Sequence, residues 1–220
     1  MSENKIQVYC LKYAESVFAE NFIFEGGNPN KLSPISFCIY LIKSNGNHIL
    51  VDAGCDTMSG FEMKGFYSPA FVLRQKGFCA DDITDVIITH SDFDHIEAVK
   101  HFKNAVVHIS KDEYERGKQY LSENKKINVF ENEFVLEPKI KIIVCGGHSK
   151  GSSIVQLTTD DLIHIFAGDE CYTNENITRK IPTGSSYNKK ASFEFIDKYS
   201  KEKYCVHTCH DSSLKTERII

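Results

Sequence analysis

The sequence predicts an α/β fold in which two packed β-sheets are flanked by helices. Short segments rich in β-branched and aromatic residues recur along the whole chain, and segments with helical patterning lie between many of them. No stretch rich in proline, glycine and serine, no block of like charges and no fixed-period repeat divides the 220 residues. We therefore expect a single domain over residues 1–220, a size that one domain commonly reaches.

The first strands are predicted from alternation and from one hairpin signal. Ile6–Leu11 alternates between apolar and polar residues, and Ile35–Lys43 and His48–Asp52 are rich in β-branched and aromatic residues. Asn45 and Gly46 lie between the second and third of these segments and are typical of a two-residue hairpin turn. The second and third strands should therefore pair antiparallel.

Strands and helices alternate in the rest of the chain. Asp85–Thr89 has the composition of a fully buried strand. Ser110 is expected to cap a helix that runs through Tyr120, with Glu113 completing a capping box. The other expected elements are strands at Ala105–Ile109, Lys139–Val144, Ser153–Thr158, Leu162–Ala167 and Tyr204–His207, and helices at Pro69–Lys76, Ile96–Phe102 and Ser192–Tyr199.

The composition excludes several classes of protein. Apolar residues make up 41% and charged residues 25% of the chain, which is typical of a globular domain and not of a disordered tail, a fibre or a small disulfide-rich protein. The net charge of −4 gives no overall positive field to hold nucleic acid or an anionic membrane. Neither a secretory signal nor an apolar run of about 18 residues is present. We expect a cytoplasmic protein that acts on a small molecule, and the sequence leaves its oligomeric state open.

The chain contains eight cysteines but no Cys-x-x-Cys pair, which zinc ribbons and thioredoxin-like sites require. Several cysteines lie in apolar runs, where a free thiol behaves as a small core residue. We expect thiols rather than disulfides in a cytoplasmic chain, and no part for them in a metal site.

A motif with the chemistry of a metal site follows the buried strand Asp85–Thr89. The segment from His90 to His95 reads His-Ser-Asp-Phe-Asp-His and offers four possible ligands in six residues. Histidine nitrogens together with carboxylate oxygens suit zinc, manganese or iron. A short acidic loop could also be a solvated turn, so this motif alone does not decide the function.

Three later residues of ligand type also follow predicted strands. His148 lies in the segment Gly-Gly-His-Ser-Lys-Gly-Ser, Asp169 follows Ala-Gly, and His210 lies between Cys209 and Asp211. Because the ends of several strands can meet at one edge of a fold, this edge could bring all of these side chains together.

The order of these motifs resembles the metallo-β-lactamase superfamily. The segment from Leu50 to Gly54, Leu-Val-Asp-Ala-Gly, is similar to an early strand-loop signature of that superfamily. The resemblance implies a four-layer αββα sandwich with a two-metal site at one edge. The likeness is strongest to the N-acyl-homoserine lactonases, because Tyr172 lies three residues after Asp169 and His210 is followed by an aspartate.

The resemblance also implies the ligands. The first ion would be held by His90, Asp92, His148 and Asp169, and the second by Asp94, His95, Asp169 and His210, with Asp169 bridging the two ions. His207 competes with His210 for the last position, and we favour His210 because it lies past the end of the strand.

Asp92 departs from the usual pattern, which has a third histidine there. With two divalent ions, three carboxylates and a bridging hydroxide the formal charges cancel, whereas a histidine at position 92 would leave one positive charge. The change favours harder ions such as manganese or iron relative to zinc, which stays allowed. Alternatively, Asp92 is too short to reach and the first position is weak or empty.

The resemblance implies a hydrolase that opens a lactone, such as an N-acyl-homoserine lactone, by attack of a hydroxide that bridges two divalent metal ions. Asp94 would carry a proton to the leaving alkoxide, and Tyr172 would donate a hydrogen bond to the carbonyl oxygen. An iron-binding redox or sensing module of the same fold, or a thioester or phosphoester hydrolase, is the alternative. Aromatic residues in the two loop-like stretches before the first ligands could line a groove for an acyl chain or belong to the core: Phe22, Phe24, Phe61, Phe66, Tyr67 and Phe71.

Overall fold

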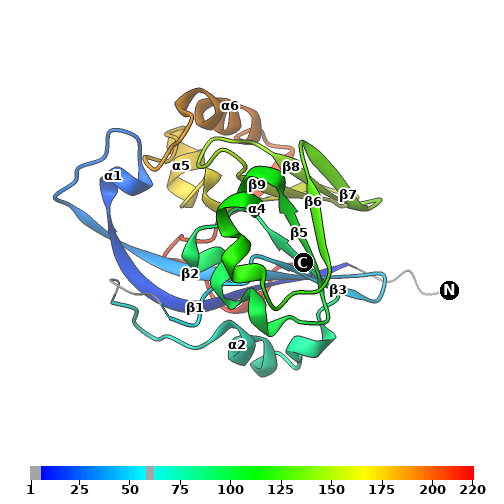
Figure 1. The fold of residues 1–220 in the computed structure, drawn as a ribbon. Helices are drawn as coiled ribbons and strands as arrows, with labels where there is room; N and C mark the ends of the chain where they lie inside the picture. Colours follow the sequence, from blue (N-terminus) through cyan, green and yellow to red (C-terminus); the bar gives the residue numbers. More distant parts are fainter. Residues whose placement is uncertain (1–5, 58–61) are drawn as a thin grey trace.

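A computed structural model describes residues 6–57 and 62–220, which form two β-sheets that face one another (Figure 1). The first sheet has seven strands in the order β12-β1-β2-β3-β4-β5-β6. Strands β12, β1, β2 and β3 pair antiparallel, and β3 to β6 pair parallel. The strands are β1 (Gln7–Ala19), β2 (Leu32–Ser44), β3 (Asn47–Val51), β4 (Asp85–Ile88), β5 (Val106–Ser110), β6 (Ile127–Phe130) and β12 (Glu217–Arg218).

The second sheet has five strands in the order β11-β10-β9-β8-β7. Strands β7 to β10 pair antiparallel, and the edge strand β11 runs parallel to β10. The strands are β7 (Glu133–Glu137), β8 (Ile140–Val144), β9 (Ser153–Thr158), β10 (Ile163–Phe166) and β11 (Tyr204–His207).

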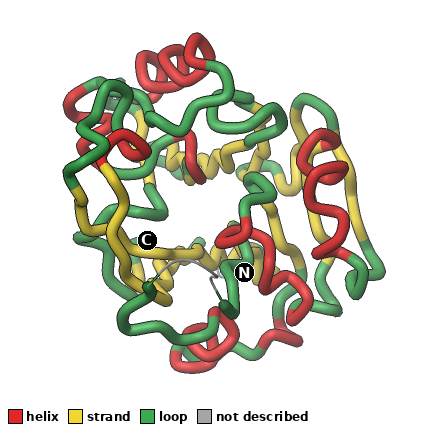
Figure 2. Tube along the Cα trace, turned by 60° about the vertical axis from the view of Figure 1, so that its left-hand side comes forward, coloured by secondary structure: helices red, strands yellow, loops and turns green. Residues whose placement is uncertain are grey.

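Helices cover the outer faces of both sheets (Figure 2). They are α1 (Glu20–Ile23), α2 (Pro69–Gln75), α3 (Phe93–Ile96), α4 (Lys111–Gly117), α5 (Asn174–Arg179) and α6 (Lys189–Tyr199), with 3-10 turns at Ala80–Asp82, Glu97–His101, Lys118–Leu121 and Gly168–Glu170. None of the helices in the described ranges is long and apolar enough to cross a membrane.

Three apolar cores separate the layers. One lies between the first sheet and helices that include α2, a second lies between the two sheets, and a third lies between the second sheet and α6. Side chains such as Leu73, Ile142 and Phe195, one from each core, are almost wholly buried. The predicted αββα sandwich is therefore confirmed.

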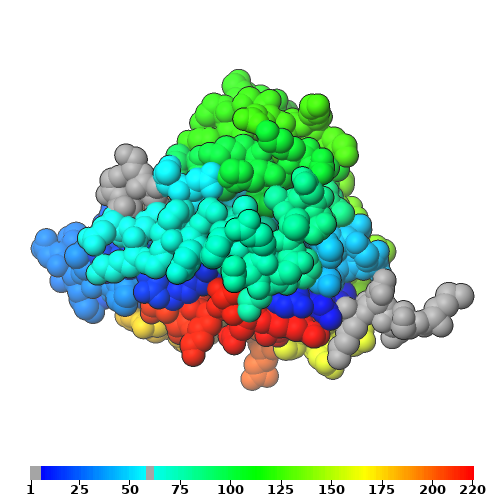
Figure 3. All heavy atoms as spheres, turned by 90° about the horizontal axis from the view of Figure 1, so that it is seen from below, coloured from blue at the N-terminus to red at the C-terminus, as the bar shows by residue number. Residues whose placement is uncertain are grey.

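The two ends of the described chain lie together. Figure 3 shows the C-terminal segment, in red, alongside the N-terminal strand, in blue, and β12 pairs with β1 through Tyr9 and Arg218. The predicted β2–β3 hairpin is also confirmed: Asn45 and Gly46 have φ values of 50° and 86°. Positive φ at both central positions is what a type I′ turn requires.

Several elements differ from the prediction. Strand β1 continues past Leu11 to Ala19 and stays paired with β2 throughout. A register shift between Lys12 and Ala14 interrupts the alternation of its residues, and the predicted strand therefore ends too early. The helix predicted at residues 96–102 begins three residues earlier as α3 and continues as a 3-10 turn. The helix after Ser110 ends at Gly117 and continues as a 3-10 turn to Leu121. Elements β6, β7, β12 and α5 were not predicted.

The predicted capping box at the start of α4 is wrong. Ser110 is the N-cap residue, but its hydroxyl donates to the carbonyl oxygen of Gly151 and forms no cap hydrogen bond. Glu113 is buried and turns its carboxylate toward two other loops. Both side chains thus join α4 to the segment that contains His148.

Candidate metal centre

The seven predicted metal ligands gather at one edge of the two sheets. Each lies in a loop, turn or short helix that begins where a strand ends, and such segments are free of the alternation that fixes side chains along a strand. They are His90 and Asp92 after β4, Asp94 and His95 on α3, His148 after β8, Asp169 in the 3-10 turn after β10, and His210 after β11.

One glycine allows the close approach of two of these loops. Gly168 has a φ of 51°, in the left-handed region, and a Cβ atom there would lie 2.7 Å from the hydroxyl oxygen of Thr89. Only glycine meets both demands without strain. Its backbone therefore brings Asp169 next to the loop that begins at His90.

The first group of side chains surrounds one oxygen of Asp169. Oδ2 of Asp169 lies 3.6 Å from Nε2 of His90 and 3.8 Å from Nε2 of His148. Oδ2 of Asp92 lies 3.2 Å from Nε2 of His148 and 3.7 Å from Nε2 of His90. One ligand atom from each of the four residues thus falls within 4.8 Å of the others.

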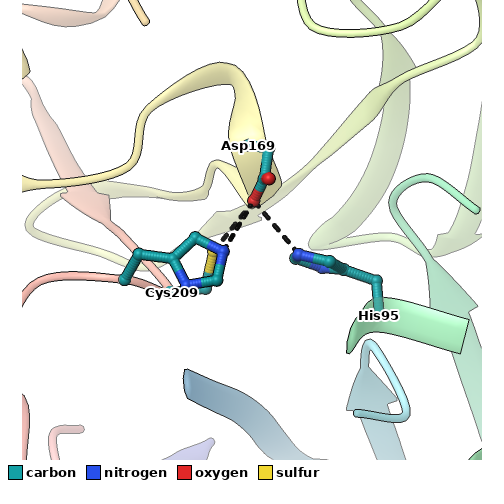
Figure 4. Close-up of side chains that lie close together, drawn as sticks. His95, Asp169 and Cys209 are labelled. Atoms are coloured by element: carbon teal, nitrogen blue, oxygen red, sulfur yellow. Dashed lines mark hydrogen bonds and ion pairs between the residues drawn. The ribbon is translucent and has the colours of Figure 1, made fainter. Parts of the chain in front are cut away.

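The second group surrounds the other oxygen of Asp169. Oδ1 of Asp169 lies 3.1 Å from Nε2 of His95 and 3.2 Å from Nε2 of His210. Oδ2 of Asp94 lies 3.5 Å and 3.6 Å from the same two nitrogens. Figure 4 shows the carboxylate of Asp169 directed toward His95, with Cys209 beside it. Asp169 therefore presents one oxygen to each group.

The imidazole rings are oriented as metal ligands are. In the described part of the chain, the Nε2 atoms of His90, His95 and His210 are buried and have no hydrogen-bond partner. Buried polar atoms are seldom left without a partner, so such atoms call for an explanation. Three convergent nitrogens around a buried carboxylate fit a divalent cation.

The opposite ring nitrogens are held by fixed acceptors. Nδ1 of His95 lies 2.8 Å from Asp52, Nδ1 of His210 lies 2.8 Å from the carbonyl oxygen of Ser36, and Nδ1 of His148 lies 2.7 Å from that of Ser185. A proton on Nδ1 leaves the lone pair of Nε2 free to bind a cation.

Asp52 joins β3 to the candidate centre. It has a φ of 63°, and its Oδ1 accepts from the backbone N–H of Thr89 while its Oδ2 accepts from the Thr89 hydroxyl and faces His95. Sequence analysis placed Asp52 in a strand-loop signature but gave it no role. The structure shows that it fixes both the loop after β4 and the ring of His95.

Two buried glutamates that sequence analysis missed support the loops. Oε2 of Glu113 accepts from the N–H and the hydroxyl of Ser91, at 2.8 and 2.6 Å, and its Oε1 accepts from the Ser149 hydroxyl at 2.6 Å. Oε1 of Glu170 accepts from the N–H groups of Gly147 and His148 at 3.0 and 3.2 Å. No local motif marks either residue as a support of these loops, because their partners there lie far away in the sequence.

Asp92 reaches the first group and is also paired with a cation. Nη2 of Arg116, on α4, donates to Oδ1 of Asp92, and Oδ2 of Asp92 faces His90 and His148. Burial alone would raise the pKa of Asp92, but the hydrogen bond from His148 and the nearby charge of His90 outweigh it and hold the pKa far below its ordinary value. Asp92 is thus an ionised carboxylate in the position where the usual pattern has histidine.

The carboxylate of Asp169 and the imidazoles around it shift one another's pKa values. Burial opposes ionisation of Asp169, but the charges of His95, His210 and His90 outweigh it and keep the pKa of Asp169 well below its usual range. In return, Asp169 and Asp94 raise the pKa of His95 well above its ordinary value against the effect of burial. Asp169 therefore stays ionised although it is buried among the imidazole rings.

Cys209 differs from the expectation that no cysteine lies at the centre. Its thiol is 3.3 Å from Oδ1 of Asp169, to which it donates. Burial, with Asp169 next in effect, raises the pKa of Cys209 well above its ordinary value, so the thiol keeps its proton. His207, the competitor for the last ligand position, instead contacts His164 and is in neither group.

A pocket of about 330 Å³ opens onto the two groups. Tyr172 forms part of its wall and stacks on the ring of His210, with centroids 5.0 Å apart. The lining residues are Val17, Phe18, Ala19, Phe22, Asp92, Phe93, Asp94, Asp169, Tyr172 and Ser185.

The aromatic residues that could line a substrate groove lie in different parts of the structure. Phe22 lines this pocket, whereas Phe24 is buried in the core between the first sheet and its helices, and Phe66 packs against that core. Tyr67 and Phe71 line a separate cavity of about 550 Å³, which none of the seven candidate ligands lines. Phe61 lies outside the described residues.

Comparisons with known proteins identify the family of the chain. The family model of the metallo-beta-lactamase superfamily matches residues 39–206. N-acyl homoserine lactonase AiiA of Bacillus thuringiensis subsp. kurstaki is 24% identical over 201 residues, which cover 80% of each chain. A probable metallo-hydrolase of Methanocaldococcus jannaschii is 28% identical over 172 residues, which cover 78% of this chain and 75% of that protein.

Solved structures show the same fold. A quorum-quenching N-acyl homoserine lactone hydrolase superposes with a TM-score of 0.83 at 21% identity, covering 97% of this chain and 98% of that one. AidC, described as a dizinc quorum-quenching lactonase, superposes with a TM-score of 0.78 at 16% identity, covering 97% of this chain and 90% of that one. Because the family model spans well over half of the sequence, the chain belongs to the metallo-beta-lactamase superfamily.

Proposed function

We propose that this chain is a metal-dependent hydrolase that opens a lactone ring, with N-acyl-homoserine lactones as the candidate substrates. The observation that carries the proposal is the position of Asp169, which offers one carboxylate oxygen to each of two groups of histidines and aspartates at the floor of a pocket. The sequence similarity to lactonases supports the choice of substrate.

The two groups define the proposed ligand sets. His90, Asp92, His148 and Asp169 would hold the first ion, and Asp94, His95, Asp169 and His210 the second. When bound, two divalent ions supply a nucleophile at neutral pH by lowering the pKa of a water molecule and polarise the carbonyl group that is attacked. Zinc fits these ligands, and the carboxylate of Asp92 also admits manganese or iron.

Tyr172 is the proposed donor to the carbonyl oxygen of the substrate. Burial raises the pKa of its hydroxyl well above the ordinary value, and the charge of Asp169 adds to the effect. The hydroxyl therefore stays protonated at neutral pH and can donate a hydrogen bond to an oxygen that gains negative charge.

Asp94 is the proposed carrier of the proton that the leaving alkoxide needs. Its carboxylate lines the pocket and its side chain is only 10% exposed. A carboxylate held at the pocket floor could take up the proton that the attacking water loses and pass it to the ring oxygen of the lactone, which would complete ring opening.

The pocket walls suit an acyl chain. Val17, Phe18 and Ala19 at the end of β1, together with Phe22 on α1, form an apolar part of the pocket lining. A pocket that combines apolar walls with a few convergent polar groups is typical of a small-molecule site. The proposed partner is therefore a small molecule with a hydrolysable head and an apolar tail.

A cytoplasmic location is part of the proposal. All eight cysteines are free thiols in the structure, and five of them are buried: Cys10, Cys38, Cys55, Cys171 and Cys209. Persistent thiols are typical of a reducing compartment.

Hydrolysis assays with defined metals test the function. The metal-free chain should be inactive, and restoring zinc, manganese or iron should restore the opening of N-acyl-homoserine lactones. The Asp169→Asn variant should stay inactive with every metal, whereas Asp161→Asn, on an exposed turn, should match the wild type. Preferential cleavage of thioesters or phosphoesters, or full lactonase activity without metal, would show that the assignment is wrong.

A further inference from the structure

Strands β10 and β11 carry a second cluster of metal-ligand side chains that the candidate centre does not use. We propose that His164, Cys205 and His207 form an additional metal site, which takes a zinc-like transition-metal ion. One ligand atom from each of the three residues lies within 4.8 Å of the others. None of the three belongs to the proposed ligand sets of the candidate centre.

The pairing of the two strands creates the cluster. Cys205 and His207 are two residues apart on β11, so both side chains point to the same face of the sheet. In the parallel register His164 on β10 lies opposite Cys205. Nδ1 of His164 is 3.0 Å from Nε2 of His207, so the two imidazole rings are in direct contact.

The surroundings of the pair are apolar. The ring of His207 lies beside the rings of Phe166 and Tyr40, with centroids 4.9 and 5.9 Å away. Across the described residues, no carboxylate forms a hydrogen bond or ion pair with the side chains of His164, Cys205 or His207. Within the described residues, each imidazole is thus the only side-chain hydrogen-bond partner of the other.

The two rings are ready to bind a cation at neutral pH. Burial lowers the pKa of His207 to about 3, with the neighbouring charge of His164 adding to the effect, and burial also lowers the pKa of His164. Both rings are consequently neutral, and a neutral imidazole has a nitrogen lone pair available for a metal.

The cluster lies at the edge of its sheet and is partly exposed. β11 is the edge strand of its sheet, and the side chains of Cys205 and His207 are only partly buried. A cation could enter here, and water could complete the coordination of an ion that has three protein ligands.

The donor set selects the class of metal. Two imidazoles and a thiolate favour zinc, cobalt or copper over magnesium, calcium or manganese. Burial raises the pKa of the Cys205 thiol, so binding at neutral pH replaces the thiol proton by the sulfur–metal bond and releases that proton to solvent. No oxidation or reduction is involved.

The site would also tie together the two strands that lead to the candidate centre. Asp169 follows β10 and His210 follows β11. An ion bound between His164 and the β11 residues would therefore hold both strand ends in register, a role that needs no contact with substrate.

Cobalt titration of the purified full-length chain tests the proposal. A thiolate bound to Co²⁺ gives a charge-transfer absorption in the near ultraviolet, which histidine and carboxylate ligands do not give. We expect the Asp169→Asn variant, which lacks the bridging ligand, still to bind one cobalt ion per chain and to show this absorption. The outcome therefore does not depend on whether the proposed hydrolase function is correct.

Four further variants test which cysteine supplies the sulfur atom that binds cobalt. Cys205→Ser and His164→Gln should each remove the absorption and lower the metal content by one ion. Cys145→Ser, another partly buried cysteine, is the matched control and should keep both signals. Cys209→Ser should also keep the absorption, although this thiol adjoins Asp169.

Two results would overturn the proposal. One is the absence of the absorption from the wild-type chain at saturating cobalt, and the other is its loss in Cys209→Ser with retention in Cys205→Ser. If Cys205→Ser does not fold, as judged by circular dichroism, His164→Gln decides alone, because loss of the ion there supports the site and retention refutes it.

Discussion

Arg116 donates from its guanidinium to Oδ1 of Asp92 and thereby leaves Oδ2 of that carboxylate facing His90 and His148. The pairing matters because Asp92 adds a negative charge where the usual superfamily pattern has a neutral histidine. If two divalent ions were bound with Asp92 among their ligands, Arg116 would return the formal charge of the centre to the value that a histidine would give. The departure at position 92 is thus accompanied by a compensating cation on a different element, α4.

Replacing Arg116 with methionine should weaken metal binding in the first group alone. The guanidinium orients Asp92, and loss of a group that orients a ligand typically costs about 10–100-fold in metal affinity. Chelator competition, which measures the two affinities in turn, should show the weaker ion lost earlier than in the wild type. Lys118→Met removes an exposed cation paired with Glu115 and is the matched control. Equal weakening of both ions, or no weakening, would contradict the role given to Arg116.

Asp169 and Tyr172 should separate metal binding from turnover. Asp169→Asn removes the charge shared by both groups, so neither ion of the candidate centre should be retained. Tyr172→Phe keeps the ring that stacks on His210 but loses the hydroxyl, so both ions should remain while kcat falls by about 10²–10³-fold, as for loss of one oxyanion donor. Metal analysis together with steady-state kinetics checks both. Loss of metal from the tyrosine variant would show that Tyr172 acts on the ligands and not on the substrate.

The place of the candidate ligands in the fold could be predicted from the sequence because each follows a recognisable strand. His90 comes directly after the apolar run of β4, and Asp169 and His210 follow β10 and β11 in the same way. The strand ends fix where these loops begin, and the spacing within the 90–95 segment brings its ligands together. Local pattern was therefore enough to bring the candidate residues to one edge.

The supporting residues could not be predicted because their partners are distant in the sequence. Glu113 has the spacing of a capping-box residue relative to Ser110, yet it contacts Ser91 and Ser149, 22 and 36 residues away. Arg116 likewise reaches a carboxylate 24 residues earlier. Such contacts depend on how α4 packs against the loops, which no local periodicity records.

Missed elements have a similar explanation. β6 and β7 are short and partly exposed, so their apolar residues do not alternate cleanly. β1 was cut short at Leu11 because the shift between Lys12 and Ala14 breaks the period of two on which the prediction relied. The hairpin turn at Asn45, by contrast, was predictable because its backbone conformation limits the residues that can occupy it.

Replacing Glu113 with glutamine should destabilise the loops on both sides of the centre. The carboxylate accepts from Ser91 and Ser149, and burial, which alone would raise its pKa, is outweighed by these hydrogen bonds, so that the pKa lies below its usual value. Losing charge-assisted hydrogen bonds at a buried site should lower the free energy of unfolding by about 3 kcal/mol. Urea unfolding of Glu113→Gln measures this loss, and Glu115→Gln, exposed on the same helix, should change stability by less than about 0.5 kcal/mol. Similar stability of the two variants would refute the supporting role.

Phe22 should set the preference for acyl-chain length. Its side chain is 51% exposed and lines the pocket next to the carboxylates, so a long acyl chain can cover it. Phe22→Ala should lower kcat/KM about tenfold for a long-chain lactone and leave a short-chain lactone nearly unchanged, because about 1–2 kcal/mol of apolar contact is lost. The control is Phe193→Ala, 52% exposed on α6 and not among the pocket-lining residues. An equal decrease for both substrates would place the acyl chain elsewhere.

Asp85 should make the fold less stable in acid. Its Oδ1 lies 2.8 Å from Nε2 of His108, whose Nδ1 accepts from the Asn128 amide, so Nε2 carries the proton and donates to Asp85. Burial alone would raise the pKa of Asp85, but hydrogen bonds from His108 and Thr84 outweigh it and hold the pKa below its ordinary value.

The unfolded chain then binds this proton more readily than the folded chain. The contribution of Asp85 to the stability of the fold is therefore complete above its unfolded pKa of about 3.9. This contribution is lost as the pH falls through the lower pKa of the folded chain. Asp85→Asn should therefore lower the melting temperature at pH 6, by an amount that corresponds to about 1.5 kcal/mol. The difference from the wild type should shrink as the pH drops below about 4. This dependence is measured by melting curves between pH 3 and 7 for the wild type, Asp85→Asn and the exposed control Asp161→Asn. If the melting temperature of Asp85→Asn stays below that of the wild type by a constant amount over this range, the ionised carboxylate is not the source of the loss.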